Sequence, residues 1–128
     1  MNIHHIGYLV KDIEKASKEF IRLGFLKQGE AVEDIDRGCL IAFFENGGYR
    51  IELVQAIDEQ SPIYRLYKKH GNSPYHICYE TDNLPLEIER MTAEGFVLLQ
   101  PPSPAPAICD RQVAFLVSKN IGLIELLG

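Results

Sequence analysis

The sequence lacks a disulfide framework. Its 128 residues contain three cysteines, and Cys39, Cys78 and Cys109 form neither a CxxC pair nor an even set. Even sets of cysteines in a short chain are typical of small secreted scaffolds. We therefore expect a reducing, cytoplasmic environment, in which these thiols are structural or incidental.

Basic clusters and long apolar runs are also missing. The formal net charge is -5 and the pI is about 5.3, which argues against nucleic acid or an anionic membrane as a partner. The N-terminus, MNIHHIGYLV, has no charged segment followed by a long apolar one, so no secretion signal is expected. The apolar runs are too short to span a bilayer. The chain does have 46% hydrophobic residues in a length typical of one domain, which is enough to bury a core.

An internal repeat is the most informative feature of the chain. The segment HIGYLVKDI at His5 resembles HICYETDNL at His76, at an offset of 76 − 5 = 71. Later matches keep the same order at offsets of 71, 72 and 73: Gly24–Phe25 with Gly95–Phe96, Ala42–Phe43 with Ala114–Phe115, and Ile51–Glu52–Leu53 with Ile124–Glu125–Leu126. Each half therefore has a histidine near its start and a glutamate near its end.

Periodicity predicts the same order of elements in each half. Alternating apolar residues indicate strands, and apolar residues three or four apart indicate helices. In the first half we expect a helix at 12–23 and strands at 2–10, 26–31, 39–45 and 49–55. In the second half we expect a helix at roughly 84–94 and strands at 75–80, 96–100, 112–118 and 122–127. A short helix is expected around 62–69.

These elements predict an α+β fold class with two tandem βαβββ modules. We expect a single domain over 1–128, with module one at about 1–57, a connector at about 56–74 and module two at about 75–128. The acidic segment 30–38 and the proline-rich segment 101–110 are expected to lack regular structure. The second of these is expected to form a wall or lid beside the site, or else an inert surface loop.

Four polar side chains stand at repeat-equivalent positions. Each glutamate lies between two apolar residues of a predicted strand, and a carboxylate there is costly unless it is paired, protonated or bound to a metal. Two such carboxylates at equivalent positions call for one common explanation. Imidazole and carboxylate ligands suit Zn, Mn, Fe, Co or Ni. We therefore predict one divalent ion bound by His5, Glu52, His76 and Glu125.

Each of these residues also has a structural interpretation. A strand histidine is more often a hydrogen-bonded core or rim residue, and a lone glutamate can be a salt-bridged edge residue. Agreement at all four repeat positions favours the metal. His4 competes with His5, but it falls on the opposite strand face and has no histidine partner in the repeat. His70 lies in the connector, where a solvated side chain is expected.

The segments HHIGYLV, YRIELV, YHICYE and GLIELL, together with the paired modules, resemble the vicinal oxygen chelate superfamily. Within it, the whole chain is similar to glyoxalase I (lactoylglutathione lyase) and to methylmalonyl-CoA epimerases. The resemblance implies an eight-stranded cup around a metal site and usually a homodimer. The ligand set at His5, Glu52, His76 and Glu125 is the pattern of glyoxalase I, so Zn, Ni, Co or Mn is expected.

Three positions depart from these relatives. Epimerases carry a second acid/base glutamate on the strand where this chain reads GCLIAFF, and the matching position here is Ile41, which cannot move a proton. Glyoxalase I holds glutathione with an arginine and an asparagine where this chain has Leu9 and Ala56. The resemblance therefore implies the chemistry of the superfamily without identifying the substrate.

The resulting expectation is a lyase or isomerase of the glyoxalase I type, which transfers a proton through a metal-stabilised enediolate on a small carbonyl or thioester substrate. Glu125 is the preferred acid/base, Glu52 is the second candidate, and no organic cofactor is expected. The alternative is an enzyme similar to methylmalonyl-CoA epimerase. An Fe(II) oxygenase would use His5, His76 and Glu125, but Glu52 would take a position that dioxygen needs. A metal-free protein that sequesters small molecules is the last alternative, and the complete ligand set and the absence of tryptophan argue against it.

Overall fold

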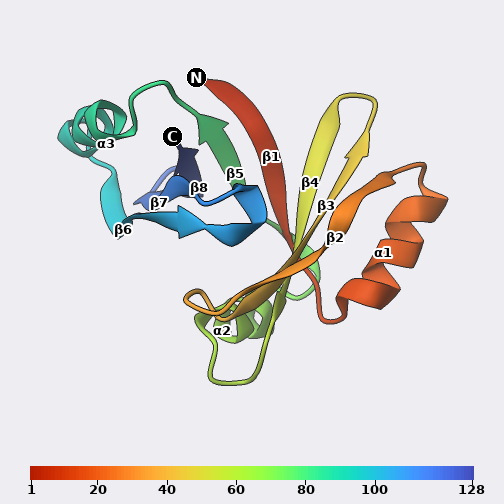
Figure 1. Ribbon diagram of the computed structural model, residues 1–128. Coiled ribbons are helices and arrows are strands. Elements are labelled where there is room, and N and C mark those ends of the chain that lie inside the picture. Colours follow the sequence, from red (N-terminus) through yellow and green to blue (C-terminus); the bar gives the residue numbers. More distant parts are fainter. The chain divides into compact units, whose positions relative to one another are not determined.

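A computed structural model describes all residues, 1–128, in two compact units (Figure 1). One unit spans His5–Tyr75, and the other combines Met1–His4 with His76–Gly128. Eight strands are described, in the order β2-β3-β4-β1 in the first module and β5-β8-β7-β6 in the second. The predicted α+β fold class with two βαβββ modules is confirmed. None of the helices has the length and hydrophobicity that spanning a membrane requires.

The first module follows the order expected from the sequence. Its elements are β1 (Asn2–Leu9), α1 (Ile13–Arg22), β2 (Leu26–Asp34), β3 (Cys39–Asn46) and β4 (Tyr49–Ala56), and α2 (Pro62–His70) follows as the connector. Strand β1 pairs in parallel with β4, whereas β2–β3 and β3–β4 are antiparallel. A parallel pair requires a long crossover, which α1 and the two intervening strands provide.

Helix α1 begins and ends where its sequence predicts. The Asp12 side chain accepts a hydrogen bond from the Lys15 backbone N–H at 3.0 Å, which caps the first turn. Gly24 follows the helix with a φ of 94°, a backbone conformation that favours glycine. Ile13 and Phe20 pack into a core cluster with Phe44 and Leu53 of the sheet. This face of β3 and β4 is therefore filled by α1, and the alternate residues of both strands point to the opposite face.

The second module repeats this arrangement. Its elements are β5 (Ser73–Glu80), α3 (Leu84–Ala93), β6 (Val97–Ala105), a 3₁₀ turn η1 (Pro106–Ile108), β7 (Arg111–Ser118) and β8 (Gly122–Leu127). Strands β5 and β8 are parallel, whereas β6–β7 and β7–β8 are antiparallel. Leu84 and Met91 of α3 pack against Ala114, Leu116 and Leu126. Helix α3 thus covers one face of its module, as α1 does in the first.

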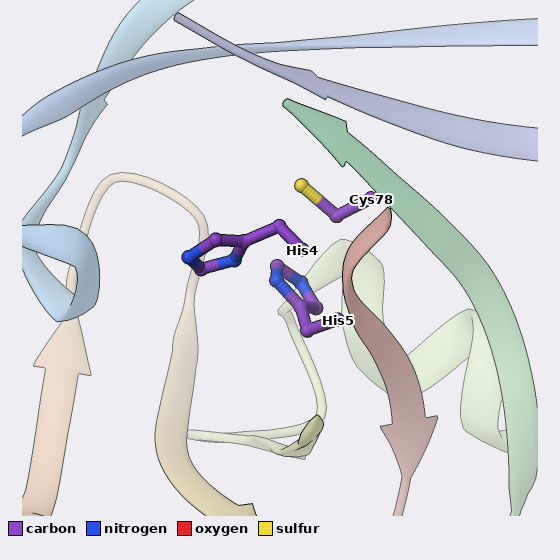
Figure 2. A group of neighbouring side chains, drawn as sticks. All are labelled: His4, His5 and Cys78. Carbon is purple, nitrogen blue, oxygen red and sulfur yellow. The ribbon is translucent and has the colours of Figure 1, made fainter. Parts of the chain in front are cut away.

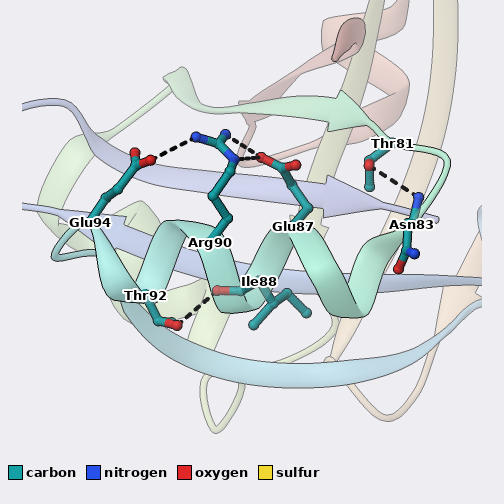
Figure 3. Close-up of polar contacts among 7 residues, drawn as sticks. All are labelled: Thr81, Asn83, Glu87, Ile88, Arg90, Thr92 and Glu94. Carbon is teal, nitrogen blue, oxygen red and sulfur yellow. Dashed lines mark hydrogen bonds and ion pairs between the residues drawn. The ribbon is translucent and has the colours of Figure 1, made fainter.

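The outer surface of α3 carries a charged network (Figure 3). Arg90 forms ion pairs with Glu87 and with Glu94, the latter at 2.9 Å. The hydrogen bond to Glu87 and the charges of both glutamates raise the pKa of Arg90 above its ordinary value. The Thr92 hydroxyl donates to the Ile88 carbonyl oxygen at 2.9 Å, and the Asn83 N–H donates to the Thr81 hydroxyl at 3.3 Å. These contacts belong to the solvent side of the helix.

Two segments that were expected to be irregular contain strand instead, and both expectations were wrong. Strand β6 continues through Pro101, Pro102 and Pro104 to Ala105, with two register shifts against β7. Proline is tolerated there because β6 is an edge strand and because bulges accommodate residues without an N–H donor.

Strand β2 likewise runs on into the acidic segment and ends at Asp34. The buried Asp34 carboxylate forms an ion pair with the Arg37 guanidinium at 2.7 Å and accepts a hydrogen bond from the Arg37 backbone N–H at 3.1 Å. This pairing explains how an acidic stretch remains ordered, because a buried carboxylate requires a partner.

Candidate functional site

The first module brings two of the predicted ligands together. His5 lies on β1 and Glu52 on β4, and the parallel register places Gly7 beside Glu52. Both side chains are on the face opposite α1, because Ile51 and Leu53 occupy the core on the helix side. The His5 Nε2 and Glu52 Oε2 atoms are 3.5 Å apart, and the two residues are only 1% and 5% exposed.

The second module contains an equivalent pair. His76 lies on β5 and Glu125 on β8, where Cys78 is the register partner of Glu125. The His76 Nε2 and Glu125 Oε2 atoms are 3.0 Å apart, and both residues are buried. Each module therefore buries one imidazole against one carboxylate at repeat-equivalent strand positions, as the sequence repeat required.

Each histidine also contacts a phenylalanine. The rings of His5 and Phe43 have centroids 5.2 Å apart at an interplanar angle of 80°, and those of His76 and Phe115 are 5.5 Å apart at 87°. Phe43 is the register partner of Glu52, and Phe115 is that of Glu125. Edge-to-face contacts of this kind restrict the rotation of the imidazole plane. The sequence showed the Ala–Phe repeat, but only the strand register reveals these contacts.

The surroundings of both pairs are apolar. In the first module, Leu9, Ile41 and Val54 share the face of Glu52 and are buried. In the second module, Cys78, Val113 and Leu127 form a cluster with Ala105, and Ile108 and Phe115 pack against it. The proline-rich segment thus contributes Ala105 and Ile108 to the face that carries His76 and Glu125. Apolar neighbours exclude water and strengthen electrostatic interactions within such a site.

The two remaining histidines differ in environment from the paired ones. His4 is half-buried next to the fully buried His5 on β1, and Figure 2 shows both histidines with Cys78 of β5. Strand alternation predicts opposite faces for successive residues, but a donor atom of His4 lies within 4.8 Å of one of His5, so alternation does not keep the two imidazoles apart. His70 is exposed at the last residue of α2, in agreement with a solvated side chain.

Comparison with known proteins identifies the family. A model described as the glyoxalase/bleomycin resistance protein/dioxygenase superfamily matches residues 4–115. The chain belongs to this superfamily. Ethylmalonyl-CoA/methylmalonyl-CoA epimerase of Cereibacter sphaeroides is 26% identical to this superfamily member over 127 residues, which are 97% of this chain and 95% of the epimerase.

Solved structures match this chain over almost its whole length. A hypothetical protein from Bacillus halodurans C-125 is 28% identical with a TM-score of 0.89, covering 98% of this chain and 92% of that one. A variant of methylmalonyl-CoA epimerase from Streptomyces coelicolor, in complex with 2-nitronate-propionyl-CoA, is 23% identical with a TM-score of 0.83, covering 99% and 93%. The comparisons therefore favour the epimerase alternative over the glyoxalase I interpretation, which they do not specifically support.

Proposed function

We propose that this protein is a metal-dependent isomerase that moves a proton at the carbon next to the carbonyl of an acyl-CoA thioester. The observation that carries the proposal is the pair of buried His–Glu contacts at repeat-equivalent positions, at 3.5 and 3.0 Å. The epimerases to which the chain is similar over its full length supply the substrate class.

The donor types of the two pairs suit a divalent transition ion. Each residue offers one imidazole nitrogen or one carboxylate oxygen, a set that suits Zn, Ni, Co or Mn. In the proposed site, His5, Glu52, His76 and Glu125 together hold the ion. A bound ion would supply Lewis-acid polarisation of the thioester carbonyl.

The glutamates perform the proton transfer in this proposal. The Glu125 carboxylate takes the proton as the C–H bond breaks, and the electron pair of that bond moves toward the carbonyl oxygen. For epimerisation, a proton must then reach the opposite face of the carbon. Glu52 is the candidate donor if it carries a proton before the step, because Ile41 has no ionisable group; Glu52 ends the step as the carboxylate, while Glu125 holds the proton taken from the carbon. The apolar residues Leu9, Val54, Val113 and Leu127 keep bulk water from the reacting carbon.

A second candidate is the glyoxalase type of isomerisation, which the aliphatic side chain of Ile41 favours. In that reaction Glu125 removes the proton and returns it on the same side of the substrate, so no second base is needed. Each proton-transfer role is typically worth ~10²–10⁴-fold in rate.

The test of both candidates is solvent exchange in D₂O. Purified protein supplied with Zn, Ni, Co or Mn would be incubated with methylmalonyl-CoA or with the methylglyoxal–glutathione hemithioacetal, and deuterium at the carbon would be followed by mass spectrometry. We expect exchange and epimerisation of methylmalonyl-CoA, and loss of both in Glu125→Gln even with excess metal. Glu87→Gln, which alters a carboxylate on α3, is the matched control. Exchange into neither substrate would refute the proposed function, and turnover unaffected by Glu52→Gln and Glu125→Gln would refute the residue assignment.

The proposal also includes a homodimer, which the family resemblance implies. Light scattering coupled to size-exclusion chromatography would give twice the monomer mass of 14.5 kDa if this is correct.

A further inference from the structure

Among the positions at which the two modules differ in charge is a cross-strand pair on the face that carries the proposed ligands. In the first module, Glu45 of β3 is the register partner of Arg50 of β4. The repeat offsets, 45 + 72 = 117 and 50 + 73 = 123, match these positions to Val117 and Leu123. Those two residues are also register partners, on β7 and β8. A charged pair in one module thus replaces an aliphatic pair in the other.

Packing does not require an arginine at this position. Arg50 and Leu123 are both half-buried, so the fold accepts an aliphatic side chain in the equivalent environment. A cross-strand pair of opposite charges contributes little to the stability of a half-exposed sheet surface. The pairing of Arg50 with Glu45 across the strands therefore adds little to the stability of the sheet.

Arg50 lies close to the first ligand pair. It precedes Glu52 by two residues and shares its strand face, at a separation of roughly 7 Å along the strand. The register of β1 with β4, in which Ile6 is beside Ile51, also brings Arg50 level with His5. Arg50 therefore stands on the same strand face as the first ligand pair and next to it in the register.

Guanidinium is the side-chain group best suited to hold a carboxylate or phosphate, because it offers two parallel N–H donors. We propose that Arg50 is a substrate-binding residue that recognises an anionic oxygen group of the acyl-CoA substrate. The inference rests on the proposed function for its substrate class. The anionic group has two sources, the acyl carboxylate and the phosphates of CoA.

Binding measurements separate these sources. Isothermal titration would compare methylmalonyl-pantetheine, which has the carboxylate and no phosphate, with propionyl-CoA, which has phosphates and no acyl carboxylate. We expect Arg50→Leu to weaken binding of one of these ligands by roughly 10- to 100-fold and to leave the other unchanged. The double variant Glu45→Val with Arg50→Leu gives the first module the same aliphatic pair as Val117 and Leu123 in the second. It tests the loss of the Arg50 guanidinium without leaving the Glu45 carboxylate beside an aliphatic partner.

Arg90→Leu is the control, because it removes an ion-paired guanidinium from the solvent side of α3 (Figure 3). Selective loss of methylmalonyl-pantetheine binding would identify the acyl carboxylate, and selective loss of propionyl-CoA binding would identify the phosphates. Unchanged affinities in Arg50→Leu, or equal losses for both ligands, would overturn the role of Arg50 while leaving the proposed isomerase intact. Wild-type protein that binds neither ligand would overturn both proposals.

Discussion

Metal binding should stabilise the folded protein by a measurable amount. The ligands of each pair are far apart in the sequence, at separations of 52 − 5 = 47 and 125 − 76 = 49 residues. The unfolded chain therefore has no preformed site, and an ion that binds only the folded state shifts the unfolding equilibrium. At a free metal concentration one hundred times the dissociation constant, the gain is about 2.7 kcal/mol. For a domain of this length, that gain raises Tm by about 10 °C.

The assay is thermal unfolding of EDTA-treated, desalted protein, with and without Zn, Ni, Co or Mn. We expect the rise in Tm for wild-type protein and for His70→Ala, because His70 lies on the exposed end of α2. His76→Ala and Glu125→Gln should lose most of it, and elemental analysis should show about one ion per chain in wild type only. A Tm that no transition ion changes, or a full rise in both site variants, would falsify the shared metal site.

Three further changes test the neighbours of the ligands. Ile41→Glu places a carboxylate at the position that the family resemblance matches to the second base of the epimerases. We expect this variant to epimerise methylmalonyl-CoA roughly 10²-fold faster than wild type. An epimerisation rate equal to that of wild type would show that residue 41 does not face the reacting carbon. Phe43→Leu and Phe115→Leu remove the ring contacts of the two histidines and should each weaken metal binding by about three- to tenfold in a chelator competition; equal affinity in all three proteins would contradict a positioning role. Pro104→Ala combined with Pro106→Ala should change KM more than metal content, because Ala105 and Ile108 of this segment lie on the site face. Altered metal content with an unchanged KM would contradict a role of this segment in substrate binding.

The repeat made most of the fold predictable from the sequence. Apolar periodicity located all eight strands and three helices to within a few residues, except where β2 and β6 continue into segments of unusual composition. Those two extensions depend on tertiary partners. The ion pair of Asp34 with Arg37 and the edge position of β6 leave no signal in local periodicity.

The candidate site was predictable to a different degree. Equivalent positions in the repeat predicted which histidine belongs with which glutamate, and the structure brings each pair within 3.5 Å. That the two pairs share one ion stays a prediction. The contacts of Phe43 and Phe115 and the pairing of Arg50 with Glu45 required the strand register, because only pairing across strands reveals which side chains are neighbours.

The prolines of β6 also limit how copies of this protein can associate. An edge strand normally offers a row of N–H and C=O groups to which another strand can add, and this is a common route to β-sheet aggregation. Strand β6 is the edge strand of the second module and has three positions without an N–H donor, Pro101, Pro102 and Pro104. In the first module, the edge strand β2 has a register shift between Gln28 and Val32. Strand addition is therefore disfavoured at β2 and at β6, so a dimer should not form by extending the backbone hydrogen-bond ladder at either of these strands.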